Sequence, residues 1–428
     1  MIRLPGLSGA SSKKTYVGFN VGDSCCQISY RSGNDEIETV SLITGAEEYN
    51  IPTVLCKREG VNQWFYGKEA VRYASEESDG ILIDNLLSLA RKGEAVIVDK
   101  VPYQPESLLA LFLKRCMSLV TTVFSEKIAG VLFTADNMSY DSIEVCRQAV
   151  KSIGLKAEKI FFQSHSESFY HFLIRQSEDI WRNGSVLFEC TAGKINAYRM
   201  ESNFRTDPVV VYISESRYET SEYSGFPESE EELARRDREF LDFARSFCDS
   251  GNTVSVYLVG DGFDESWMRM SRKYLTDNFR VFQGSNLFSK GACYGILDRM
   301  AGDDLTKKYL FLGNDKLSCN VGMKVFSQGD EKYYAILDAG TSWYDAKRSF
   351  EYYIQDGDHI ELILTSLTGG GERVARITFD DFSGKITRFR TTLYMENENT
   401  LITETEDLGF GEFRPSSGRV WREEIPAD

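Results

Sequence analysis

The chain has 428 residues, a length that exceeds one typical domain and predicts two or more. Hydrophobic residues make up 42% and charged residues 27%, the composition of an ordinary globular protein with enough apolar material for a core. A formal net charge of −16 would repel a polyphosphate backbone, so we expect no nucleic-acid partner.

The apolar content is spread along the chain. The residues before Tyr16 contain no apolar run as long as that of a signal peptide, and no stretch approaches the ~18 apolar residues of a membrane span. Nine scattered cysteines without a C-x-x-C spacing are typical of reduced thiols. The adjacent Cys25 and Cys26 fit either a redox pair or a strand interior. We therefore expect a cytoplasmic protein without a membrane partner.

Up to about residue 300, strand-like runs alternate with helical patterns. Strands are predicted over 16–28 (a hairpin), 51–55, 131–134, 186–188 and 254–259. Helices are predicted over 108–123, 143–153 and 267–275, and Ser229 with Glu232 fits a capping box before a further helix. This alternation predicts an α/β architecture.

From Tyr309 onward the helical periodicity disappears. Short strands, each followed by a turn, are predicted over 333–337, 349–354, 360–365, 373–379, 387–395 and 401–406. Such even spacing predicts an antiparallel sandwich.

Three glycine-containing segments in the α/β part are candidates for binding phosphate or nucleotide. Backbone amides of a turn and the N-termini of helices after strands suit anionic ligands. Each segment taken alone also fits an ordinary turn, where glycine and aspartate serve the backbone. The candidate residues are Gly18, Asn20, Gly22, Asp23, Ser24, Glu189, Gly193, Lys194, Gly260 and Gly262.

The order of these segments resembles that of the actin-like ATPase superfamily, and within it the seventy-kilodalton heat-shock chaperones. Further likenesses are the segments 51–54 with 66–70, 133–155, 259–263, 291–295, the apolar run 309–312 and the hairpin 397–401. The resemblance implies an α/β actin-like (ribonuclease-H-like) two-lobed nucleotide-binding domain over 15–307 and a β-sandwich without a helical lid over 315–428. A flexible tail (1–14) and an apolar linker (308–314), docked or paired into a sheet edge, complete the expected organisation. The segment 202–250 implies a reduced lobe on the adenine side.

The departures from the family concern its catalytic groups. The family's magnesium-organising aspartate falls at Asn20, its catalytic lysine near Asn85 and its connector glutamate at Gln163. Asp23 places a carboxylate where phosphate oxygens would lie, which opposes triphosphate binding. Phosphoryl transfer depends on metal and cation, so we expect no catalytic residue, no metal ligand and an eroded ATPase site. ATP or ADP, bound weakly, is the only expected cofactor. Two interpretations of Lys194 remain open: its side chain contacts an anion, or its loop is retained for folding alone.

The second half of the chain carries the expected peptide site. Positions similar to the family's substrate channel are Val321, Phe350, Tyr353, Ile360 and Leu362. Such a channel binds an extended apolar peptide, or a segment of a partner protein, through backbone hydrogen bonds and an apolar pocket. The alternative is that these side chains simply fill the core of the sandwich.

Two functions remain open. One is a chaperone-like binding or scaffold protein, a pseudoenzyme with little or no ATP hydrolysis. The alternative is an active ATP-driven molecular chaperone; filament formation is a third candidate that the attached sandwich disfavours. His165, His171 and His359 lie too far apart in sequence to predict a metal site.

Overall fold

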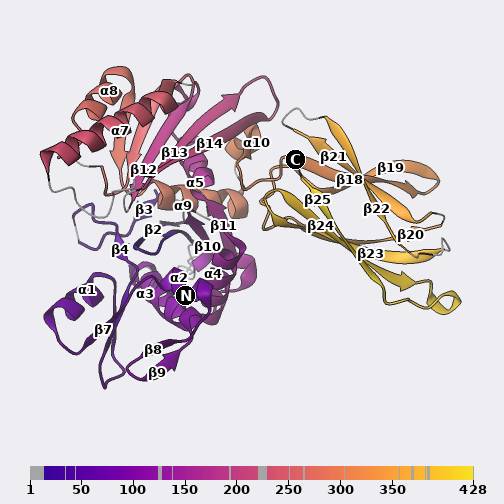
Figure 1. Cartoon of the computed structure of the whole chain (residues 1–428), viewed down its shortest axis with the longest axis horizontal. Coiled ribbons are helices and arrows are strands. Elements are labelled where there is room, and N and C mark those ends of the chain that lie inside the picture. The colour runs from indigo at the N-terminus through magenta and orange to yellow at the C-terminus, as the bar shows by residue number, and fades with distance from the viewer. Residues whose placement is uncertain are drawn as a thin grey trace, which may run out of the picture. The chain divides into compact units, whose positions relative to one another are not determined.

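A computed structural model (Figure 1) describes residues 14–33, 35–43, 45–123, 128–136, 138–191, 194–219, 229–249, 251–263, 266–302, 304–355, 357–367, 371–380, 382 and 386–427. The chain divides into two compact units. The first takes in the described residues up to Val209 together with Ile213–Tyr309, and the second consists of Val210–Tyr212 and the chain from Leu310 onward.

The first large sheet has the strand order β11-β10-β1-β2-β3, with β4 paired to β2. Its strands are β1 (Thr15–Val21), β2 (Cys25–Ser32), β3 (Glu38–Thr39), β4 (Ile51–Pro52), β10 (Ile128–Ala135) and β11 (Ile160–Ser164). β1 runs antiparallel to β2 and parallel to β10, which runs parallel to β11. Strands β1 and β10 are buried along almost their whole length, which explains their nearly continuous apolar sequence.

The second large sheet has the order β16-β15-β12-β13-β14-β17. Its strands are β12 (Ser185–Thr191), β13 (Lys194–Asn203), β14 (Val209–Glu219), β15 (Ser255–Val259), β16 (Arg280–Gly284) and β17 (Tyr309–Leu312). It repeats the pattern of the first sheet, because β12 and β13 form an antiparallel hairpin while β15 and β16 add in parallel on the other side.

Helices α7 (Glu230–Asp249) and α8 (Met270–Asn278) pack together on this second sheet (Figure 1). Phe240 of α7 and Leu275 of α8 are fully buried in one core with Phe188 of β12. The predicted capping box before α7 is confirmed, because the Ser229 backbone nitrogen donates to Glu232 Oε2 at 3.1 Å and the Glu232 nitrogen donates to Ser229 Oγ at 3.3 Å.

The remaining elements of the first unit are short strands and helices. Two small sheets are formed by β5 (Leu55–Arg58), β6 (Trp64–Tyr66), β7 (Gly80–Ile83), β8 (Val96–Val98) and β9 (Val101–Tyr103). The other helices are α1 (Gly67–Glu76), α2 (Leu86–Lys92), α3 (Pro105–Val123), α4 (Tyr140–Ser152), α5 (His165–Leu173), α6 (Glu178–Trp181), α9 (Leu287–Ala301) and α10 (Asp304–Lys308). None of the helices in the described part of the chain has both the length and the apolar character needed to cross a membrane.

The second unit consists of two antiparallel sheets around one core. The first has the order β19-β18-β21-β22, formed by β18 (Cys319–Ser327), β19 (Asp330–Leu337), β21 (His359–Ser366) and β22 (Glu372–Thr378). The second has the order β20-β23-β24-β25, formed by β20 (Lys347–Ile354), β23 (Thr387–Asn397), β24 (Thr400–Gly409) and β25 (Val420–Pro426). Burial alternates along β23, as expected for a strand with one face on a core.

The expected actin-like (ribonuclease-H-like) two-lobed fold is wrong for this chain. The described residues form a mixed α/β chain in which strand residues outnumber helical residues, and the strands are distributed over six sheets. The part after Tyr309 is all-β. The physical reason is that a local pattern predicts the type of an element but not its partners. Strands β5 to β9 are only three or four residues long and pair into small sheets that the expected architecture did not include.

Candidate functional site

A cluster of polar side chains lies where strands of the two large sheets end. Asp136 follows β10 and His165 follows β11, and these neighbouring parallel strands end at the same edge because Ala135 pairs with Ser164. Asn20 lies near the end of β1, which pairs in parallel with β10. Glu189 lies near the end of β12 in the second sheet. The parallel pairing therefore explains why residues far apart in sequence meet.

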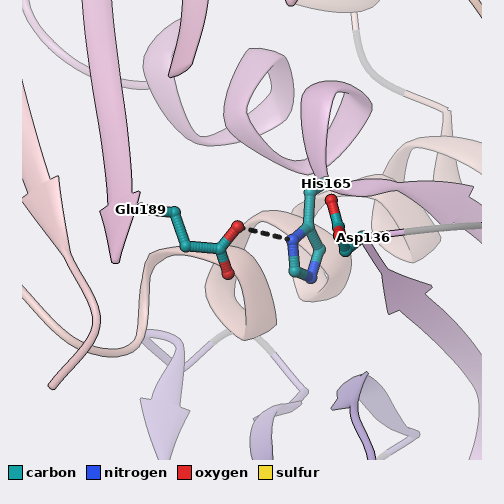
Figure 2. Close-up of side chains that lie close together, drawn as sticks. All are labelled: Asp136, His165 and Glu189. Carbon is teal, nitrogen blue, oxygen red and sulfur yellow. Dashed lines mark hydrogen bonds and ion pairs between the residues drawn. The ribbon is translucent and has the colours of Figure 1, made fainter. Parts of the chain in front are cut away.

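His165 connects the two sheets. Its Nε2 lies 2.8 Å from Oδ1 of Asn20, and its Nδ1 lies 3.4 Å from Oε2 of Glu189. Figure 2 shows the imidazole between Glu189 and Asp136, with the contact to Glu189 drawn as a dashed line. The ring stacks on Phe288 of α9 at a centroid distance of 3.8 Å and an interplanar angle of 8°. The imidazole is therefore held in one orientation.

Further donors surround the two carboxylates. The Tyr198 hydroxyl lies 3.2 Å from Asp136 Oδ1 and 3.4 Å from Glu189 Oε2, and the side-chain amide nitrogen of Asn196 lies 3.2 Å from the same two oxygens. Arg217 of β14 donates to Asp136 Oδ2 at 2.8 Å and to Asn196 Oδ1 at 2.8 Å. We call Asn20, Asp136, His165, Glu189, Asn196, Tyr198 and Arg217 the polar cluster.

The cluster changes the acidity of its buried members. Burial alone would lower the pKa of His165, but the charge of Glu189 and the contact with its carboxylate outweigh burial and raise it above its ordinary value. Burial would raise the pKa of Glu189, but His165, Asn196 and Tyr198 lower it on balance. Burial, reinforced by the Glu189 charge, raises the pKa of Tyr198 well above normal. The arrangement therefore favours an ionised Glu189 carboxylate beside a protonated His165 imidazole.

The donor set of the cluster also suits a metal ion. One ligand atom each from Asp136, His165 and Glu189 lies within 4.8 Å of the other two. Asp136 is exposed, whereas His165 and Glu189 are buried. A depression of about 300 Å³ reaches Asp136 and is lined by Asp136, Asn196, Ala197, Tyr198, Glu215, Ser216 and Arg217.

Of the nine expected nucleotide-binding residues that the structure describes, only Asn20 and Glu189 belong to this cluster. Asp23 instead accepts hydrogen bonds from the Ser88 backbone nitrogen at 2.8 Å and the Ser88 hydroxyl at 2.6 Å, and pairs with Arg91 at 3.2 Å. Its carboxylate therefore caps the start of α2. Ser24 is exposed between β1 and β2, Lys194 is exposed at the start of β13, and Gly22 is half-buried. Gly193 lies outside the described residues.

The other glycines have packing roles. A Cβ on Gly18 would stand 2.2 Å from the backbone nitrogen of Cys293, so this glycine allows α9 to approach β1. Gly260 has a φ of 98°, and a Cβ there would stand 2.3 Å from the carbonyl oxygen of Cys190. A Cβ on Gly262 would stand 2.2 Å from the Cys190 sulfur. These three glycines serve close contacts between elements.

The second unit contains a groove with a volume of about 1040 Å³. Phe350, Tyr353 and Ile360 of the expected peptide site line it, although Ile360 is only 6% exposed and also belongs to the core between the sheets. Val321 and Leu362 are 1% and 0% exposed and belong to that core alone. Other side chains that line the groove include Tyr334, Tyr352, Ile363, Val374 and Phe410, which the sequence pattern did not single out.

Sequence reasoning also missed most of the polar cluster. No ligand role was predicted for His165, because the three histidines lie far apart along the chain. Its partners in the structure are 24 and 145 positions away. A usable signal was that Asp136 follows the apolar strand predicted over 131–134 and that His165 follows a second apolar run, Ile160–Ser164, which was not predicted as a strand.

The first unit is thus a mixed α/β unit with a buried His–carboxylate cluster, and the second is an all-β unit with an open groove. The chain belongs to the family of unknown function DUF5716, whose C-terminal model matches residues 36–314. Residues 316–427 match a domain of unknown function, DUF8552. No curated protein matches the chain.

Proposed function

We propose that this protein is a chaperone-like binding or scaffold protein that holds an extended apolar segment of a peptide or partner protein in the groove of its second unit. The observation that carries the proposal is the groove itself. Most of its residues come from β19, β20 and β22, each of which is the outermost strand of its sheet, and from β18 and β21, which lie between β19 and β22. Outermost strands offer backbone groups to which an extended chain can pair.

The side chains of the groove suit an apolar occupant. Tyr353 and Val374 are 57% and 52% exposed, and Phe350 is half-buried with its ring 5.7 Å from that of Tyr334. Burying apolar surface contributes roughly 25 cal/mol per Å². Backbone pairing along a strand would add affinity without demanding a particular sequence. An extended segment with apolar side chains therefore matches both features.

The polar cluster supports a role without ATP turnover. Asn20 offers an amide where magnesium would need a carboxylate, and the Glu189 carboxylate faces His165. Asp23 is committed to Ser88 and Arg91. Phosphoryl transfer needs a metal and cations placed around the phosphates. In this proposal ATP or ADP binds weakly and does not control peptide binding in the groove.

We place the protein in the cytoplasm. None of the nine cysteines, all of which the structure describes, forms a disulfide, and all except Cys25 are buried. Thiols in this number fit a reducing compartment.

The groove is tested by fluorescence anisotropy with labelled extended apolar peptides and the full-length chain. Val374→Asp places a charge in the groove, on the outermost strand β22. Val420→Asp is the control, because it places the same charge on another outermost strand, β25, away from the groove. The two valines are 52% and 62% exposed, so the variants are closely matched. Val374→Asp should weaken peptide binding at least ~10-fold, since a desolvated charge costs more than 1.4 kcal/mol. Val420→Asp should bind like the unmodified protein.

The peptide role is contradicted if no peptide binds saturably, or if both variants bind equally well. ATP hydrolysis measured on the same preparation should stay at background. Turnover that accelerates peptide release would instead support the active ATP-driven chaperone.

A further inference from the structure

We propose that Asp136, His165 and Glu189 bind a divalent first-row transition-metal ion directly, through Nδ1 of His165 and one carboxylate oxygen of each acid. The site lies in the first unit and is independent of the peptide groove. It requires no nucleotide, because the ligands all come from the protein.

The first argument concerns the tautomer of His165. Its Nε2 lies 2.8 Å from the amide oxygen of Asn20, which only accepts hydrogen bonds, so Nε2 carries a hydrogen. In a neutral imidazole Nδ1 then has a free lone pair, which is the form that binds metals. That lone pair faces Oε2 of Glu189. Two acceptors face each other only when something positive lies between them, either a proton or a metal ion.

The second argument concerns the distance between these two atoms. A charge-assisted hydrogen bond from nitrogen to a carboxylate is usually about 2.7–2.9 Å long. Nδ1 of His165 and Oε2 of Glu189 are 3.4 Å apart. Two ligands at about 2.1 Å from one tetrahedral ion are separated by roughly 3.4 Å. The observed separation therefore fits a shared ion better than a shared proton.

The third argument concerns the groups around the ligands. Metal-binding histidines usually donate their second nitrogen to a fixed oxygen, which Asn20 provides here. Tyr198 and Asn196 donate to the same oxygens of Asp136 and Glu189, and so hold the two carboxylates toward one point. Such supporting donors orient ligands and raise affinity.

Charge and access are also suitable. Asp136 and Glu189 supply two negative charges. Among the described residues, Arg217 is the only cation besides His165 that forms an ion pair with them. The depression lined by Asp136 and Tyr198 provides an entry path. One imidazole with two carboxylates suits Zn²⁺ or Mn²⁺ better than Mg²⁺, which prefers oxygen ligands only.

The experiment is calorimetric titration of the untagged full-length chain, stripped of metal with EDTA, with ZnCl₂, MnCl₂ and MgCl₂. Zn²⁺ or Mn²⁺ should bind one to one, and Mg²⁺ more weakly. His165→Asn and Glu189→Gln should each weaken binding at least ~10-fold. His359→Asn removes the histidine beside Asp358 in the second unit and should leave the affinity unchanged.

A second variant keeps the test decisive if those variants unfold. Arg217 is 48% exposed and pairs with Asp136, so Arg217→Ala should preserve the fold and remove a competitor for the carboxylate. Arg217→Ala should therefore bind Zn²⁺ or Mn²⁺ more tightly than the unmodified chain. The site is refuted if the unmodified chain binds no Zn²⁺ or Mn²⁺ saturably, if Mg²⁺ binds equally well, or if His165→Asn has no effect. Weaker or unchanged binding in Arg217→Ala also counts against it.

Discussion

Gly18 of β1 and Cys293 of α9 meet backbone to backbone, since a Cβ on Gly18 would stand 2.2 Å from the nitrogen of Cys293 and 2.4 Å from the carbonyl oxygen of Ser289. Both obstructing atoms belong to the main chain of a helix. They cannot move aside as the end of a flexible side chain can. The glycine that was expected to approach a phosphate therefore approaches a helix.

Gly18→Ala should lower the free energy of unfolding by about 2 kcal/mol or more, because overpacking a core usually costs ~1–3 kcal/mol and the neighbours here are backbone. Urea denaturation measures this as a lower midpoint with an unchanged slope. Gly284→Ala is the control, because a Cβ there meets nothing within 4 Å, and it should change stability by no more than about 0.5 kcal/mol. If Gly18→Ala were as stable as the control, the close contact would not exist.

Local pattern predicted many elements well. The helix expected over 143–153 is α4 (Tyr140–Ser152), and the strand expected over 254–259 is β15 (Ser255–Val259). Both have strong periodicity or a continuous apolar run, which are properties of neighbouring residues. The partners of an element are not local properties, so the grouping of strands into sheets in the first unit was predicted wrongly.

The polar cluster shows the same limit. Asn20 and Glu189 were selected as separate candidates, but their connection through His165 depends on three strand ends from two sheets. Gly18 and Asp23 matched a motif and yet serve packing and helix capping, because glycine and aspartate suit those roles equally well. A motif defines residue types, and only the fold decides which groups those residues contact.

Asp407 of β24 is the basis of a prediction about pH. Its buried carboxylate accepts hydrogen bonds from the Thr387 hydroxyl at 2.7 Å, the Gly409 nitrogen at 2.9 Å and the Ser417 hydroxyl at 2.7 Å. Burial alone would raise the pKa of Asp407, but these hydrogen bonds outweigh burial and lower it. Folding is therefore stabilised by the charged form.

The sign of the pH dependence follows from that shift. The unfolded carboxyl has a pKa of about 3.9, so the contribution of Asp407 is fully present above that pH and is lost as pH falls through the lower folded value. Asp407→Asn should destabilise the protein by about 1–3 kcal/mol at pH 7 and flatten the loss of stability below pH 4. Urea titrations at pH 7, 5, 4 and 3 measure both effects. Asp380→Asn, an exposed position in the same unit, should keep the acid dependence of the unmodified protein; equal curves for both variants would contradict the role of Asp407.

Strand β17 is the basis of the last prediction. It carries the apolar run of Tyr309, Leu310, Phe311 and Leu312, and it pairs with β14. Phe311 is 7% exposed, and the Tyr309 ring packs against Trp181 at a centroid distance of 5.5 Å. Apolar side chains buried in this way, together with strand pairing, should protect the β17 amides strongly from hydrogen exchange.

A ligand shifts this protection only if it binds one state of β17 more tightly than another. Asn20, Asp23 and Glu189, three of the expected nucleotide-binding residues, are held by internal contacts, so ATP provides no such difference in the function proposed here. Hydrogen exchange of peptides covering 309–312 should therefore be slow and equal with and without ATP and Mg²⁺. Phe311→Asp should accelerate it, whereas Phe413→Asp, at a 92% exposed position of the second unit, should not. A clear change in the exchange of β17 on adding ATP would mean that nucleotide acts on this strand, and it would favour the active ATP-driven chaperone over a scaffold.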